Sequence, residues 1–119
     1  MKSLHRIKAL ETYNGARIML KQGLVYPSYM LLKEATRSTL AYINEDIQDK
    51  NYSEKTKLRT LIDESPAQLS QDIDLSVFDV FVDMDREGLA AILSLDIETL
   101  KRVKSVLKRL IGMYLNEQV

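Results

Sequence analysis

The chain has 119 residues, of which 45% are hydrophobic and 29% charged, and its 17 Lys and Arg are balanced by 17 Asp and Glu. This length fits one domain with one core, and the composition is typical of a compact folded protein, which argues against intrinsic disorder. Because the sequence contains no cysteine, disulfides, thiolate metal sites and cysteine catalysis are excluded.

The first predicted element is a helix over residues 2–21. Apolar residues recur there at spacings of three and four, which is the period of one helical face. Gly23 then fits the left-handed position just past a helix end, and Lys21 suits the negative end of the helix dipole. The predicted apolar face is Leu4, Ile7, Leu10, Tyr13 or Asn14, Ile18 and Leu20.

A second long helix is predicted to begin at Pro27. Proline is tolerated in the first turn of a helix, and it favours an extended residue before it. So short a corner requires the first two helices to lie antiparallel and adjacent. Small residues at 35, 38, 39 and 41 would let a neighbouring helix approach closely. The predicted face is Leu31 or Leu32, Ala35, Thr36, Thr39, Leu40, Ile43 and Ile47.

The middle of the chain predicts a third helix that is broken near Pro66. Ser53 can cap its first piece, whose face contains Leu58, Leu61 and Ile62, and Pro66 ends that piece. Any of Asp72, Asp74 and Ser76 can cap the second piece. Residues 77–82 are rich in β-branched and aromatic residues, so an extended segment is the alternative, but no partner strand is predicted elsewhere.

A short turn and a closing helix complete the predicted fold. Gly88 ends the preceding helix, and residues 89–93 form about one apolar turn. Asp96 caps the last helix, whose stripe is Ile97, Leu100, Val103, Leu107, Leu110, Ile111 and Tyr114. We therefore expect one all-α domain over residues 1–119, an up-and-down four-helix bundle with its third helix broken near Pro66.

Few residues can carry chemistry. His5 is the only histidine, and its place near the N-terminus predicts an exposed surface side chain. Asp79, Asp83 and Glu87 share a helix face, but a carboxylate ladder without loop geometry is typical of a solvated surface. The glycine-rich and catalytic motifs of nucleotide-binding proteins and hydrolases are missing. No catalytic residue, metal site or cofactor is predicted.

Positive charge gathers at the two ends of the sequence. Residues 1–44 carry seven Lys and Arg against two acids, residues 45–98 carry five against fourteen, and residues 99–119 carry five against one. Basic side chains on helices can contact phosphates, although they also simply keep an amphipathic helix in water. The candidates for nucleotide or RNA binding are Arg17, Lys21, Arg37, Arg102 and Lys104.

Three stretches carry a resemblance to a known family. Residues 16–37 read ARIMLKQGLVYPSYMLLKEATR, residues 57–62 read KLRTLI, and the closing helix covers residues 96–115. In apolar pattern and small residues they resemble the HEPN family of helical nucleotide-binding domains. The resemblance implies an up-and-down four-helix bundle that is often dimeric. Family members include ribonucleases of toxin systems and silent relatives that pair with a nucleotidyltransferase or serve as interaction modules.

The chain departs from the catalytic members of that family. Their activity uses an Arg-x4-6-His motif near the start of the last helix, and here neither Arg86 nor Arg102 is followed by a histidine. An arginine alone can stabilise the phosphorane but cannot act as the base. We therefore expect no ribonuclease activity of the family's type, and we expect that the protein is not an enzyme.

Three functions remain open after the sequence is read. The leading expectation is a non-catalytic HEPN-like domain that acts through protein contacts, as a homodimer or as the partner of another protein such as a nucleotidyltransferase. The alternative is a module that binds nucleotides or RNA. A third is an enzyme that uses carboxylates or tyrosines. No secretion signal or membrane span is predicted, so the expected location is the cytoplasm, away from membranes.

Overall fold

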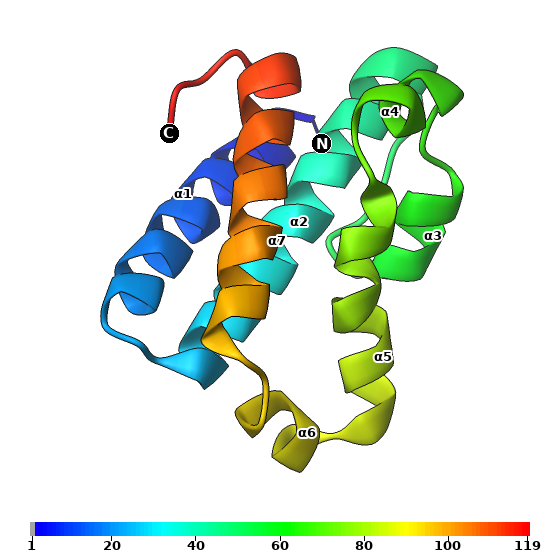
Figure 1. Ribbon diagram of the computed structural model, residues 1–119. Coiled ribbons are helices and arrows are strands. Elements are labelled where there is room, and N and C mark those ends of the chain that lie inside the picture. The colour runs from blue at the N-terminus through cyan, green and yellow to red at the C-terminus, as the bar shows by residue number, and fades with distance from the viewer. Residues whose placement is uncertain (1) are drawn as a thin grey trace.

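The computed structural model describes residues 2–119, except for the side chains of Lys2, Ser3 and Asp85. All regular secondary structure in the described residues is helical, without a strand, which confirms the all-α prediction (Figure 1). In chain order the elements are α1 (Lys2–Lys21), α2 (Val25–Gln48), α3 (Leu58–Asp63), α4 (Ala67–Asp72), the 3-10 turn η1 (Leu75–Phe78), α5 (Asp79–Glu87), α6 (Leu89–Leu93), α7 (Ile97–Leu110) and the π-helical turn η2 (Ile111–Leu115).

The corner between α1 and α2 depends on Gly23, as predicted. Gly23 has φ +72°, its N–H donates to the Leu20 carbonyl at 3.0 Å, and the next N–H donates to the Met19 carbonyl at 3.1 Å. The prediction that α2 begins at Pro27 was wrong by two residues. Pro27 is the third residue of α2, where a missing N–H still costs nothing, and Tyr26 before it is helical rather than extended.

The buried face of α1 differs from the predicted one. Leu4, Ile7 and Ile18 are exposed by 42%, 52% and 45%, so the prediction was wrong for them. The core residues of α1 are Ala9, Tyr13, Ala16 and Leu20. Small residues decide this outcome because they let α2 approach, and a methyl group added to Gly15 would lie 3.2 Å from a methyl carbon of Leu31.

Helix α2 is the centre of the molecule. It packs against α1 along much of its length and also contacts α3, α6 and α7. As predicted, Leu32, Ala35, Thr36, Thr39, Leu40 and Ile43 are buried, whereas Ile47 is 37% exposed. Figure 1 shows α7 running in front of α1 and α2, and α5 lies on the side of α7 opposite to α1.

Aromatic contacts hold α5 and η1 to α2. The rings of Tyr29 and Phe81 meet edge to face with centroids 5.5 Å apart, and the Tyr29 hydroxyl donates to the Phe81 carbonyl at 3.2 Å. Phe78 stacks beside Phe81 at 6.4 Å. Residues 77–82 are thus helical, as predicted, and their aromatic side chains serve helix packing.

The break near Pro66 is confirmed, but the helix before it is shorter than expected. Helix α3 begins after Lys57, five residues beyond the predicted cap Ser53, whose hydroxyl instead accepts from the Lys55 N–H at 3.2 Å in a turn. Helix α3 ends at Asp63, and Pro66 precedes α4 rather than ending α3.

The remaining predicted caps are confirmed. The Asp74 carboxylate accepts from the Ser76 N–H at 3.1 Å, and that of Asp96 accepts from the Glu98 N–H at 3.0 Å. Gly88 ends α5 with φ +90°. Leu100, Val103, Leu107, Leu110 and Ile111 are fully buried, so the predicted stripe of the last helix faces the core.

Candidate functional site

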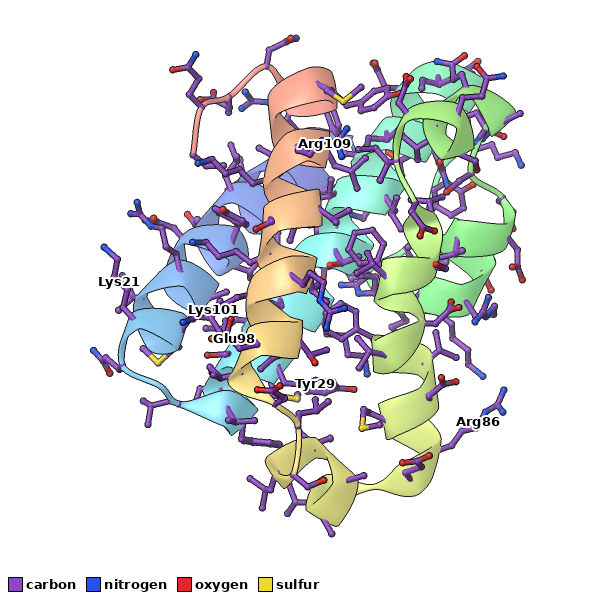
Figure 2. All side chains as sticks on the ribbon, viewed as in Figure 1. Lys21, Tyr29, Arg86, Glu98, Lys101 and Arg109 are labelled. Atoms are coloured by element: carbon purple, nitrogen blue, oxygen red, sulfur yellow. The ribbon has the colours of Figure 1, made fainter. Side chains whose placement is uncertain are left out.

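Three of the five sequence-predicted basic residues meet in one groove between α1 and α7. Arg17 and Lys21 come from the second half of α1, and Lys104 comes from α7. The groove has a volume of about 390 Å³, and we call it the basic groove; its lining residues are Arg17, Leu20, Lys21, Lys101, Lys104 and Ser105. Figure 2 shows Lys21 and Lys101 on the same side of the molecule, at the end of α1 and near the start of α7.

Lys104 lies at the centre of this positive charge. Its side chain is half-buried, and burial is the main cause that lowers its pKa. The charges of Lys108, Arg17, Lys21 and Lys101 lower that pKa further. Lys104 and the four other cations therefore repel one another, and an anion bound in the groove would reduce that repulsion.

Two of the cations that line the groove are partly engaged by polar groups. Lys101 forms an ion pair with Glu98 at 3.4 Å, between side chains that are 54% and 69% exposed. Arg17 donates to the Asn14 amide oxygen at 2.8 Å. Exposed pairs of this kind are weak and easily exchanged, so they leave the groove able to receive phosphate.

The other two candidates lie elsewhere. Arg102 is exposed on α7 and is not among the described residues that line the basic groove. Arg37 is on α2, where only 8% of it is exposed. The Arg37 side chain lines a different groove. Arg109, which like Arg102 is on α7, donates a hydrogen bond to the Asp72 carbonyl at 3.2 Å.

The groove at Arg37 has a volume of about 610 Å³ and lies between α2, the segment before α3, and α5. We call it the Arg37 groove. Six cations and two carboxylates line it together with three other side chains: Lys33, Glu34, Arg37, Glu54, Lys55, Thr56, Lys57, Leu58, Arg59, Val82 and Arg86. Sequence reasoning missed five of these cations, because they come from segments that only the fold brings together.

The prediction of a surface histidine was wrong. His5 is 1% exposed, and its Nε2 lies 2.9 Å from the Tyr52 carbonyl and 3.2 Å from the Glu45 carboxylate. Glu45 also accepts from the Tyr52 N–H at 2.7 Å. The reason is the helix period: His5 precedes Ala9 and Tyr13 on the buried face of α1. That spacing was the available signal.

This polar cluster ties α1 and α2 to the segment before α3. The Tyr52 hydroxyl donates to Glu64 at 2.9 Å, and burial, followed by that bond, raises the pKa of Tyr52 to about 12. His5 Nε2 faces two acceptors and therefore carries the hydrogen. These side chains bond to one another and to the backbone of Tyr52, so we interpret the cluster as a structural tie that holds these segments together.

Metal ligation finds no support in the geometry. Within residues 2–119, apart from the undescribed side chains, no group of three or more histidines and carboxylates converges on one point. Asp79 of the predicted acidic ladder instead pairs with Arg59 at 3.3 Å. In the described part of the chain, none of the helices combines the length and the apolar character that crossing a bilayer requires.

Comparison with known proteins gave no relatives. No model of a protein family, no curated protein and no solved structure matches this chain. The resemblance to the HEPN family therefore stays a prediction.

Proposed function

We propose that the protein binds the phosphate backbone of RNA in the basic groove and leaves the RNA uncleaved. The observation that carries the proposal is the basic groove itself, in which the half-buried Lys104 lies beside Arg17, Lys21 and Lys101 from two helices. Gathering like charges costs stability, and a polyanion is the partner that offsets this cost. In this proposal the chain is a single HEPN-like, up-and-down four-helix bundle located in the cytoplasm.

The spread of the charges favours a strand over a single nucleotide. Lys101, Lys104 and Lys108 follow one side of α7, and at ~1.5 Å per residue the first and last lie about 10 Å apart along the helix. Arg17 and Lys21 extend the same surface across α1. One phosphate is too small to contact all five cations, whereas successive phosphates of a strand can.

The lining of the groove also predicts that binding does not depend on the sequence of the RNA. Its described lining residues include Leu20 and Ser105 but no aromatic side chain on which a base could stack. Stacking and base-edge hydrogen bonds are the usual sources of sequence preference in single strands. Binding should therefore depend on salt and hardly at all on sequence.

A direct test compares two double variants that remove the same charge. Fluorescence anisotropy with a labelled single-stranded RNA should show much weaker binding for Lys101→Gln/Lys104→Gln. The matched control, Arg102→Gln/Arg109→Gln, removes two cations of α7 that do not line the groove and should bind nearly as the parent does. Equal losses in both variants, or no binding by the parent at low salt, would refute the proposal. A gel of the same samples should show intact RNA.

A second candidate is the expected self-association, and exposed apolar residues favour it. Leu24, Tyr26 and Met30 at the α1–α2 corner and Leu89 and Leu93 on α6 are all 40% to 57% exposed. Helices α2 and α6 are in contact, and Figure 1 shows the corner and α6 at the same end of the molecule. We define these five residues as the apolar end. A second copy of the chain would bring an identical apolar end, which a two-fold dimer can bury.

Light scattering over a range of concentrations tests this candidate. The parent should be dimeric at high concentration, and Leu93→Asp should be monomeric because it places a charge in the contact. Ile7→Asp, on the exposed side of α1, should leave the dimer intact. A parent that is monomeric at every concentration would exclude the homodimer. It would leave a different protein, such as a nucleotidyltransferase, as the remaining possible partner of the apolar end.

A further inference from the structure

We propose that the Arg37 groove is a second binding site, that it takes a phosphate monoester, and that the guanidinium of Arg37 is its anchor. The inference does not rest on RNA binding in the basic groove, because the two sites use different elements. The basic groove lies between α1 and α7, whereas the Arg37 groove lies between α2, the segment before α3, and α5. Figure 2 shows Lys21 and Arg86, one near each groove, at opposite edges of the molecule.

The first observation is a buried donor without an acceptor. Arg37 directs Nε at 3.2 Å and Nη2 toward the two oxygens of Glu34. Its Nη1 is buried and has no hydrogen-bond partner among the described residues. Buried guanidinium nitrogens are normally satisfied, so an unsatisfied one that belongs to a groove-lining residue indicates a missing anionic partner.

The second observation is that Glu34 does not neutralise its surroundings. The Glu34 carboxylate also pairs with Lys8 of α1 at 2.8 Å, so one negative charge is shared by two cations. Burial would raise the pKa of Glu34, but the hydrogen bonds from Arg37 and Lys8 outweigh it and lower the pKa. Glu34 therefore stays ionised, and it orients Arg37 while leaving Nη1 without an acceptor among the described residues.

The third observation is the charge of the groove rim. Lys33, Lys55, Lys57, Arg59 and Arg86 surround Arg37, against the carboxylates of Glu34 and Glu54. Arg59 is engaged by Asp63 at 3.7 Å and Asp79 at 3.3 Å. Lys55, Lys57 and Arg86 alone still outnumber the two carboxylates. An arginine anchor with several flexible lysines around it is a common arrangement for a phosphate dianion.

The shape of the site favours a monoester over inorganic phosphate alone. Its volume of about 610 Å³ exceeds what a phosphate needs and is in the range of small-molecule sites, about 300 to 1,000 Å³. Leu58 and Val82 contribute apolar wall beside the cations. The organic part of a small metabolite, or the end of a 5′-phosphorylated RNA, would contact that wall while the phosphate meets Arg37.

The test follows the Arg37 side-chain Nε–H signal by NMR in the full chain. We expect inorganic phosphate and 5′-AMP to shift this signal saturably, with 5′-AMP binding more tightly, whereas adenosine, acetate and sodium chloride at matched ionic strength do not. An RNA with a 5′-phosphate, compared with the same RNA with a 5′-hydroxyl, distinguishes a polymer end from a small metabolite. The site is refuted if no phosphate probe shifts the signal, or if acetate or chloride shifts it equally.

Variants distinguish the loss of phosphate binding at Arg37 from a loss of folding. Arg37→Lys keeps the charge but loses the guanidinium fork, and its loss of phosphate binding counts only if its circular dichroism is that of the parent. Lys57→Gln/Arg86→Gln alters exposed rim residues that should not be needed for folding, and it should weaken 5′-AMP at least several-fold. Arg102→Gln/Arg109→Gln, at residues that line neither groove, should leave 5′-AMP affinity unchanged. Equal affinity of the rim variant and the parent would overturn the assignment.

Discussion

At the scale of single residues, burial decides what each polar group does. The lone histidine has the chemistry of a catalyst, yet its ring is enclosed and bonded to Tyr52 and Glu45. Lys104 is half-buried among like charges. In the first case the Nε2 atom has partners within the fold, and in the second we propose that RNA supplies the partner.

Replacing His5 by alanine should destabilise the protein by about 2 to 4 kcal/mol, because it leaves the Glu45 carboxylate buried with fewer partners and opens a cavity. Urea unfolding followed by circular dichroism measures the change. His5→Gln, which can still donate a hydrogen bond, should recover part of the loss. Leu4→Ala, one residue away and exposed, should cost less than about 1 kcal/mol; equal losses for His5→Ala and Leu4→Ala would contradict the structural tie.

Lys104→Gln should stabilise the protein while weakening RNA binding. Burial, followed by the neighbouring cations, lowers its folded-state pKa, so the charged form of Lys104 is disfavoured in the folded chain and the folded state bears the whole penalty below that pKa. Stability of the parent should rise as pH increases from that lowered pKa toward the ordinary lysine value. The variant should lose this rise and gain roughly a few tenths of a kcal/mol at neutral pH, as for like-charge pairs on helices. Urea unfolding at neutral and alkaline pH tests both statements.

At the scale of elements, the sequence indicated where helices begin and end better than which face they bury. Gly23, Asp74, Gly88 and Asp96 act where predicted because capping depends on neighbours in the chain. The face of α1 was misread because Leu4 and Ile7 outweigh Ala9 in hydrophobicity. Close helix packing prefers the alanine, and that preference depends on a partner helix that the period alone does not reveal.

The corner between α1 and α2 gives a test at this scale. Gly23→Ala should destabilise the protein by about 1 to 2 kcal/mol, because a side chain disfavours φ +72°. Space is not the cause, since no described atom outside Gly23 and its two chain neighbours lies within 4 Å of the added carbon. Gly112→Ala in η2, without positive φ, should be neutral or slightly stabilising. Calorimetry that found the two substitutions equivalent would show that the left-handed turn is not what holds the corner.

At the scale of the whole molecule, long-range neighbours create the candidate sites. The uneven charge of the sequence indicated basic surfaces, and the packing of α7 beside α1 brings three of the binding candidates, Arg17, Lys21 and Lys104, into one groove. The Arg37 groove combines positions 33 to 86 from three parts of the chain. No local pattern contains that information, because it depends on how α5 and the segment before α3 pack onto α2.

The salt dependence of RNA binding tests the central proposal most directly. For single strands the slope of log K against log salt is about −0.7 for each phosphate contacted. Anisotropy titrations should therefore show a steep negative slope for the parent, reduced in magnitude by about 1.4 in Lys101→Gln/Lys104→Gln, which loses two such contacts. Arg102→Gln/Arg109→Gln should retain the parent slope. A parent slope near zero, or the same slope in all three proteins, would contradict RNA binding in the basic groove.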